Sequence, residues 1–155
     1  MSYYKIFKKT KKIVKNYKLC GTVMKGLGEA RKLGCPTANI TTKKQPFSGI
    51  FTALVTLNGK KFPGLVFSGI RHSHDKKLVT EVHILNGFKK MIYGEKIEVV
   101  LKIKLRDNMK FFDKEGKFDL SALKNQIKKD IENANKYWKN SSFSVKNNHI
   151  ISLNK

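Results

Sequence analysis

Thr37 and Asn39 carry the side chains in this chain that best suit metal and phosphate chemistry. They lie two residues apart after Pro36, so in an extended segment both point to the same side. A hydroxyl and an amide carbonyl are hard oxygen ligands that suit Mg²⁺, with water and phosphate oxygens completing its coordination. Upstream, Gly26 and Gly28 allow the backbone to approach phosphates closely. These residues predict a site for a nucleotide and its metal, although a stiff surface turn uses the same residue types.

Glu81 is a single carboxylate inside an apolar run, residues 78–85, that predicts a strand. Alternation puts it on one face with His83, while Val82 and Ile84 belong to the more apolar face. From this periodicity alone, Glu81 is expected to be a solvent-facing strand residue.

The elements that must position these residues are short strands separated by turn signals. Asn58-Gly59 is a strong hairpin signal, and Pro63 indicates an edge or a bulge in the strand that returns from it. Strands are expected at residues 18–23, 49–57, 61–68, 78–85 and 97–105. This pattern predicts a small antiparallel barrel or sandwich.

The hydrophobic period then changes from two to about 3.6, which predicts one amphipathic helix. Its apolar stripe consists of Leu120, Leu123, Ile127, Ile131, Ala134 and Trp138. Asp119 or Ser121 can cap its first turn. The 155 residues suit one domain, which we place at residues 18–139, between a basic extension (1–17) and a C-terminal tail (140–155).

The charge is strongly positive, +22 at neutral pH. It comes from 30 Lys and only 3 Arg, spread along the whole chain, whereas base readout and bidentate phosphate binding favour Arg. No apolar run approaches the length of a transmembrane helix, and the N-terminus lacks the apolar core of a secretory signal. Two cysteines fit a reducing cytoplasm. We therefore expect a cytoplasmic monomer that binds neither membrane nor, in a specific manner, nucleic acid.

Several motifs, in order along the chain, resemble the riboflavin kinase (flavokinase) family. The first three are Gly21-x-Val23-x-x-Gly26-x-Gly28, Leu33-Gly34-x-Pro36-Thr37-Ala38-Asn39 and Pro46-x-x-Gly49-Ile50-Phe51. The later ones are Thr80-Glu81-Val82-His83-Ile84-Leu85, Tyr93-Gly94, Leu105-Arg106 with Lys110-Phe111, and Leu123-x-x-Gln126-Ile127-x-x-Asp130. The resemblance implies a mainly β fold, a six-stranded antiparallel Greek-key barrel with a C-terminal helix. It also implies transfer of the γ-phosphoryl group of ATP to the 5′-hydroxyl of riboflavin, giving FMN and ADP.

The resemblance assigns roles to individual residues. Glu81 falls on the catalytic carboxylate that takes the hydroxyl proton, and Thr37 and Asn39 fall on the ligands of Mg²⁺, with Zn²⁺ as the alternative metal. The nucleotide-binding residues would be Gly26, Gly28, Arg31, Pro36, Thr37 and Tyr93. The flavin-binding residues would be Arg106, Lys110 and Phe111.

Two alternatives stay open. Glu29-Ala30 stands where the family often has Arg-Gly, and residues 71–74 differ from the usual pattern; both departures fit a flavin- or nucleotide-binding barrel with impaired catalysis. A basic barrel that binds nucleic acid is the second alternative. Its affinity would fall steeply with salt concentration, whereas kinase activity would depend on a divalent metal and riboflavin.

Overall fold

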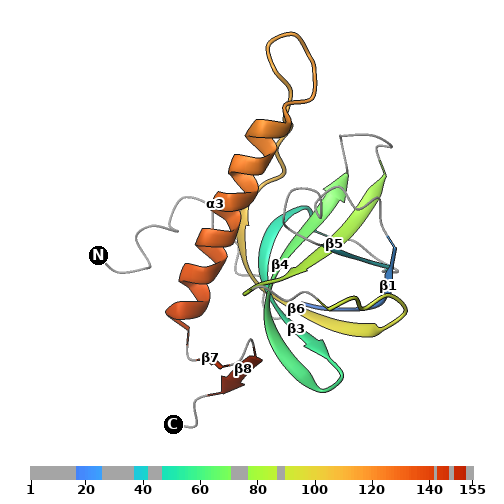
Figure 1. The fold of residues 1–155 in the computed structure, drawn as a ribbon, viewed down its shortest axis with the longest axis vertical. Coiled ribbons are helices and arrows are strands. Elements are labelled where there is room, and N and C mark those ends of the chain that lie inside the picture. Colours follow the sequence, from blue (N-terminus) through green and yellow to red (C-terminus); the bar gives the residue numbers. More distant parts are fainter. Residues whose placement is uncertain are drawn as a thin grey trace.

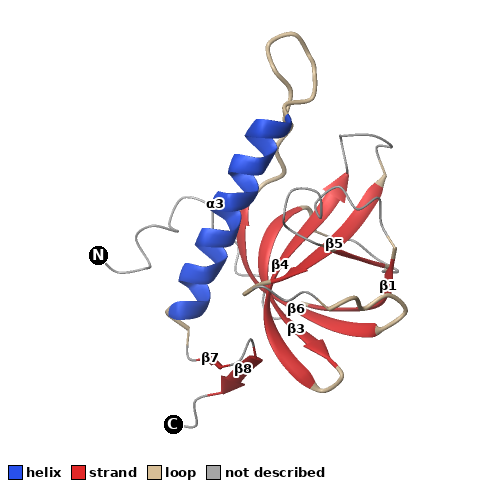
Figure 2. Ribbon diagram, viewed as in Figure 1, coloured by secondary structure: helices blue, strands red, loops and turns tan. Residues whose placement is uncertain are grey.

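Six antiparallel strands form a closed barrel in the computed structural model, which describes residues 17–25, 37–41, 47–70, 77–86, 90–141, 143–146 and 149–152. The strands are β1 (Lys18–Met24), β2 (Ala38–Ile40), β3 (Gly49–Leu57), β4 (Lys60–Ile70), β5 (Leu78–Ile84) and β6 (Lys96–Arg106). Their order around the barrel is β1-β2-β5-β4-β3-β6 (Figures 1 and 2). The expected six-stranded barrel is confirmed.

The hairpin between β3 and β4 turns where the sequence predicts it. Asn58 and Gly59 both have positive φ, 50° and 74°, as a two-residue turn of the primed type requires. Pro63 lies within β4, which has strand neighbours on both sides, so the edge-strand interpretation is wrong for β4 as a whole. The ladder with β5 begins only at Gly64, however, and Pro63 lies just past its end, where the Pro63 carbonyl accepts from the Leu85 N–H at 2.9 Å. A missing N–H is tolerated at such a position.

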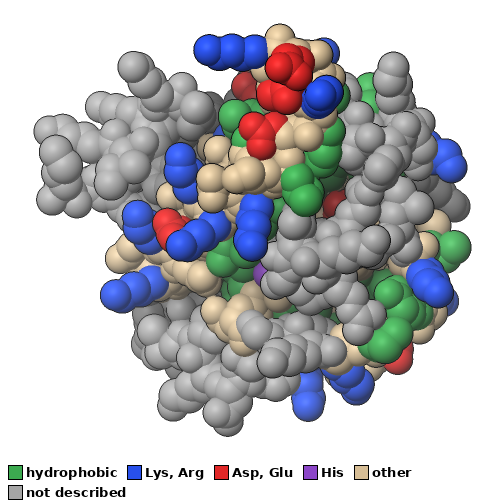
Figure 3. Space-filling model, turned by 45° about the horizontal axis from the view of Figure 1, so that its top comes forward, with side chains coloured by type: hydrophobic (Ala, Val, Ile, Leu, Met, Phe, Trp, Pro, Cys, Tyr) green, Lys and Arg blue, Asp and Glu red, His purple; other side chains and the backbone are tan. Residues whose placement is uncertain are grey.

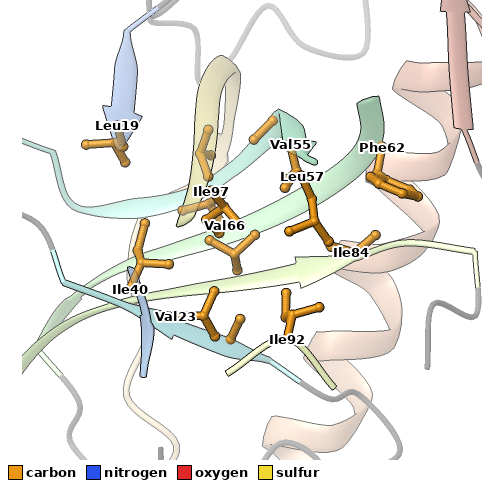
Figure 4. Packing of buried hydrophobic residues seen from close by; sticks show 14 of the residues in the cluster. Leu19, Val23, Ile40, Val55, Leu57, Phe62, Val66, Ile84, Ile92 and Ile97 are labelled. Atoms are coloured by element: carbon orange, nitrogen blue, oxygen red, sulfur yellow. The ribbon is translucent and has the colours of Figure 1, made fainter. Parts of the chain in front are cut away.

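The barrel interior is a packed apolar core (Figure 4). Phe51, Val55, Val66, Val82 and Val99 are each at most 1% exposed. They come from four different strands. Alternate residues of a strand share a face, so one face of each of these strands points into this core. The strand residues that alternate with these core residues therefore belong to the outer face.

One helix, α3 (Leu120–Lys139), lies against the outside of the barrel (Figure 1). Asp119 caps it, since its side chain accepts a hydrogen bond from the Ala122 N–H at 2.9 Å. Ala134 and Trp138 are buried against outer-face residues of the barrel such as Leu65. The amphipathic helix predicted from the apolar stripe is confirmed, with Asp119 as the cap.

Two further strands, β7 (Phe143–Lys146) and β8 (His149–Ser152), pair as a small antiparallel hairpin beyond α3. They fall in the segment that we interpreted as a C-terminal tail, so that segment contains regular structure that we did not anticipate. None of the described helical residues forms a segment long and apolar enough to cross a membrane.

Candidate active site

The short strand β2 places Asn39 directly opposite Glu81 of β5. Their neighbours Ala38 and Val82 also pair, and both point into the core. The side chains of Asn39 and Glu81 therefore project from the opposite, outer face of the barrel. Side chains of directly opposite residues have Cβ atoms about 4.5–5.5 Å apart. An amide and a carboxylate thus lie side by side on the outer face, and both are half-buried.

Thr37 immediately precedes β2 and is also half-buried. It lies two residues before Asn39, so the pleat of an extended chain directs both side chains to the same face. The structure therefore pairs two of the groups that the sequence analysis proposed, the Asn39 amide and the Glu81 carboxylate, and the Thr37 hydroxyl is expected on the same side.

This pairing belongs to a row of outer-face residues, here called the outer row, that crosses all six strands. In strand order its members are Met24, Asn39, Glu81, Phe67, Ile50 and Arg106. Neighbouring strands lie about 4.8 Å apart. Arg106 is three strands from Glu81, so their backbones are separated by about 14 Å along the wall of the barrel. The proposed base and the proposed flavin-binding arginine thus share a row without being adjacent.

The Arg106 guanidinium is held by α3. Its Nε and Nη2 donate to the two carboxylate oxygens of Asp130 at 2.8 and 2.7 Å, and Gln126 Nε2 donates to Asp130 Oδ1 at 3.0 Å. Asp130 is only 3% exposed. This bidentate ion pair fixes α3 to the end of β6. Most of the N–H donors of Arg106 thus already have protein partners. Binding of flavin by Arg106 stays a prediction.

A hairpin connects β6 to α3 and extends beyond the N-terminus of the helix (Figure 1). It is built around Asp113, whose Oδ1 accepts from the backbone N–H groups of Glu115 and Lys117, each at 2.9 Å. Lys110 is exposed and Phe111 is half-buried at its base. Both remain candidates for flavin binding.

The turn that contains Tyr93 lies beside the end of β1. The Gly94 N–H donates to the Val23 carbonyl at 2.9 Å, and the Val23 N–H donates to the Glu95 carbonyl at 2.9 Å. Tyr93 is 44% exposed. Since β1 runs directly into the glycine-containing loop, this turn lies next to the start of the proposed nucleotide-binding segment.

Four of the proposed nucleotide-binding residues lie outside the described residues: Gly26, Gly28, Arg31 and Pro36. The departures at Glu29-Ala30 and at residues 71–74 also lie outside them. Within the part of the chain that the structure describes, no three His, Cys, Asp or Glu side chains gather into a metal cluster. A metal at this site would be held by the hydroxyl of Thr37 and the amide oxygen of Asn39, together with ligands from water and substrate.

That donor set fits Mg²⁺ in chemical type. The ligand atoms of Thr37 and Asn39 are oxygens, which are hard ligands, and Mg²⁺ commonly binds few protein groups while retaining water and substrate phosphate oxygens. Zn²⁺ instead favours histidine and cysteine. The residues on this face can thus hold a hydrated hard cation and accept a proton nearby.

Lys and Arg side chains are scattered over the described part of the face that Figure 3 shows. Some of this charge is locally compensated: the hydrogen bond from Lys104 lowers the pKa of the Asp107 carboxyl. Burial lowers the pKa of Lys102, and the nearby charge of Lys61 lowers it further.

The structure thus defines a closed six-stranded antiparallel barrel with one packed helix and with an amide and a carboxylate side by side on its outer face. Comparison with known proteins identifies the family. The family model for riboflavin kinase, Flavokinase, matches residues 13–138. This chain belongs to the riboflavin kinase family.

A curated relative is consistent with this family assignment. A bifunctional riboflavin kinase/FMN adenylyltransferase from Buchnera aphidicola is 39% identical over 128 residues, covering 79% of this chain and 39% of the relative. The chain thus spans about two fifths of the length of such curated relatives.

Two solved structures share the fold. A macrolide-efflux protein from Streptococcus pneumoniae superposes with a TM-score of 0.64 at 27% identity, covering 77% of this chain and 38% of that one. Riboflavin kinase from Trypanosoma brucei superposes with a TM-score of 0.53 at 23% identity, covering 79% and 77%. At 23% identity, the similarity to the Trypanosoma brucei structure establishes the fold alone.

The sequence analysis missed two residues that organise this region. Asp130 was noted only as part of a motif, although its spacing from Gln126 places both on one helix face, which is the available signal for their contact. Asn108 has no sequence signal, because its contact with β4 depends on how the hairpin folds back.

Proposed function

We propose that this chain is a riboflavin kinase that transfers the γ-phosphoryl group of ATP to the 5′-hydroxyl of riboflavin. The observation that carries the proposal is the cross-strand pairing of Asn39 with Glu81. This pairing supports the proposal that a carboxylate and a metal-ligating amide act at the same place on the outer face. Family membership supplies the substrates.

Glu81 is the proposed base. The riboflavin 5′-oxygen attacks the γ-phosphorus, the bond to the oxygen bridging the β- and γ-phosphorus breaks, and ADP leaves. Glu81 accepts the proton of the attacking hydroxyl and, before that, orients it by accepting its hydrogen bond. Phosphoryl transfer has a loose transition state, so positioning and charge neutralisation provide most of the catalysis.

Thr37 and Asn39 are the proposed ligands of the divalent metal, with Mg²⁺ preferred. When bound, the metal supplies positive charge that neutralises the phosphate oxygens. The two side chains hold the nucleotide end of the site on β2, one strand away from Glu81. Tyr93 and the segment that contains Gly26, Gly28, Arg31 and Pro36 are proposed to bind the nucleotide. Arg106, Lys110 and Phe111 are proposed to bind the flavin.

The experiment is chromatographic detection of FMN after incubation with riboflavin, ATP and Mg²⁺. Glu81→Gln should lower kcat by on the order of 10²–10⁴, since it removes the proton acceptor while preserving shape. Glu98→Gln is the matched control, because Glu98 is a half-buried strand carboxylate on β6 that pairs with Lys18 at 2.9 Å. Unchanged turnover in Glu81→Gln would remove Glu81 from the mechanism.

The metal ligands are tested separately. Thr37→Ala should raise the Mg²⁺ concentration needed for half-maximal activity and raise KM for ATP, whereas Thr56→Ala, at a half-buried position of β3, should not. If the wild-type protein binds riboflavin but forms no FMN under any divalent metal, the alternative of a catalytically impaired barrel replaces this proposal.

A further inference from the structure

Asn108 docks the segment after β6 onto β4. Its Nδ2 donates to the Ser68 carbonyl at 3.2 Å. The adjacent Gly69 permits this approach, because a Cβ at that position would overlap the Asn108 carboxamide nitrogen. The carboxamide therefore occupies the place that a side chain at position 69 would otherwise fill.

That place lies on the outer face beside the candidate active site. Phe67 belongs to the outer row, so Gly69, two residues further along β4, faces the same side. Gly69 pairs with Val79, and Glu81 is two residues beyond Val79 on β5. Diagonal neighbours of this kind lie about 7–8 Å apart. The Asn108 carboxamide is thus a polar group diagonal to the proposed base.

The other end of this carboxamide has no partner among the residues that the structure describes. Asn108 Oδ1 is inaccessible to solvent and accepts no hydrogen bond from the part of the chain that the structure describes. A buried acceptor without a donor is destabilising, and such groups are uncommon enough in native proteins that each needs an explanation. Docking onto β4 uses only Nδ2, so it does not account for Oδ1.

We infer that Asn108 Oδ1 accepts a hydrogen bond from a ribityl hydroxyl of the bound flavin. The inference rests on the proposed function. The 5′-hydroxyl must come within hydrogen-bond distance of Glu81, and the hydroxyls on the preceding carbons are the next donors along the substrate. A donor on the ring system lies farther from Glu81. Asn108 is therefore a specificity-determining residue for the polyol chain of the substrate.

The first test compares Asn108→Ala with Asn135→Ala, a control at an exposed position of α3. We expect Asn108→Ala to raise KM for riboflavin about 3- to 10-fold, the effect of one uncharged hydrogen bond, with KM for ATP unchanged. The melting temperature should stay close to that of the control, because the substitution removes an unpaired acceptor together with one hydrogen bond. A lower melting temperature with equal losses for both substrates would show a structural role and overturn the inference.

The second test uses substrate analogues and remains informative even if Asn108→Ala is less stable. Wild-type protein should show a 3- to 10-fold lower kcat/KM for one of the 2′-, 3′- and 4′-deoxyriboflavins, and Asn108→Ala should not distinguish that analogue from riboflavin. If Asn108→Ala instead loses discrimination only against 3-methylriboflavin, the partner is the ring N–H and the ribityl assignment is wrong.

The two proposals can fail separately. If the wild-type protein forms FMN and Asn108→Ala matches it in KM and in analogue discrimination, only the role of Asn108 is refuted. If the wild-type protein forms no FMN and does not quench riboflavin fluorescence, the proposed function fails and the role of Asn108 fails with it.

Discussion

Replacing Asp130 with alanine should destabilise the fold, because it leaves the Arg106 guanidinium without its counter-ion. The two side chains are 4% and 18% exposed and form a bidentate pair. Removing one partner of a buried pair costs about 3–5 kcal/mol. Arg106 keeps some solvent contact and its bond to the Asp107 carbonyl, so we expect a loss of about 3 kcal/mol, the lower end of this range. For a domain of this size that corresponds to a melting temperature lower by roughly 6–12 °C.

Urea and thermal unfolding, followed by circular dichroism at neutral pH, measure this loss. The matched control is Glu132→Gln, which removes a negative charge from an exposed position of the same helix and should change stability by less than about 0.5 kcal/mol. Arg106→Met combined with Asp130→Leu should recover much of the stability, since no unpaired charge remains. If Asp130→Ala were as stable as the control, the ion pair would not stabilise the docking of α3.

Two further substitutions test local features. Thr52→Val should cost about 1–3 kcal/mol in urea unfolding, because Thr52 Oγ1 accepts from the Ile103 N–H at 3.3 Å where β3 and β6 shift register; a neutral result would mean that another acceptor satisfies this N–H. Asp119→Ala should cost about 1 kcal/mol and speed amide exchange in the first turn of α3; unchanged exchange would argue against the cap.

Most of the barrel and the helix could be predicted from the sequence, because their segments are long enough to show a clear hydrophobic period. The strands at 49–57 and 97–105 and the apolar stripe of α3 are examples. The strand β2 was not predicted as a strand, since its three residues are too short to show alternation. It forms because β1 and β5 pair with it on either side.

The candidate site was harder to predict than the fold. Residue types identified Thr37 and Asn39 as metal ligands, but nothing in their local sequence relates them to Glu81. Alternation predicted correctly that Glu81 faces away from the barrel core. Which strand lies beside it depends on register, and register is set by tertiary pairing around the whole barrel.

The interior of the barrel is filled by core side chains, as in other small barrels. The proposed site therefore uses residues of the outer face. Among the described elements, α3 and the hairpin before it are packed or docked against that face, through the Arg106–Asp130 pair and through Asn108 on β4. The two attachments differ in kind. The Asp130 carboxylate accepts from Arg106 and Gln126 and should act mainly on stability, whereas Asn108 has an acceptor without a partner among the described residues and should act mainly on substrate affinity. Asp130 and Asn108 variants should therefore separate stability from riboflavin affinity, although both residues hold the same segment to the barrel.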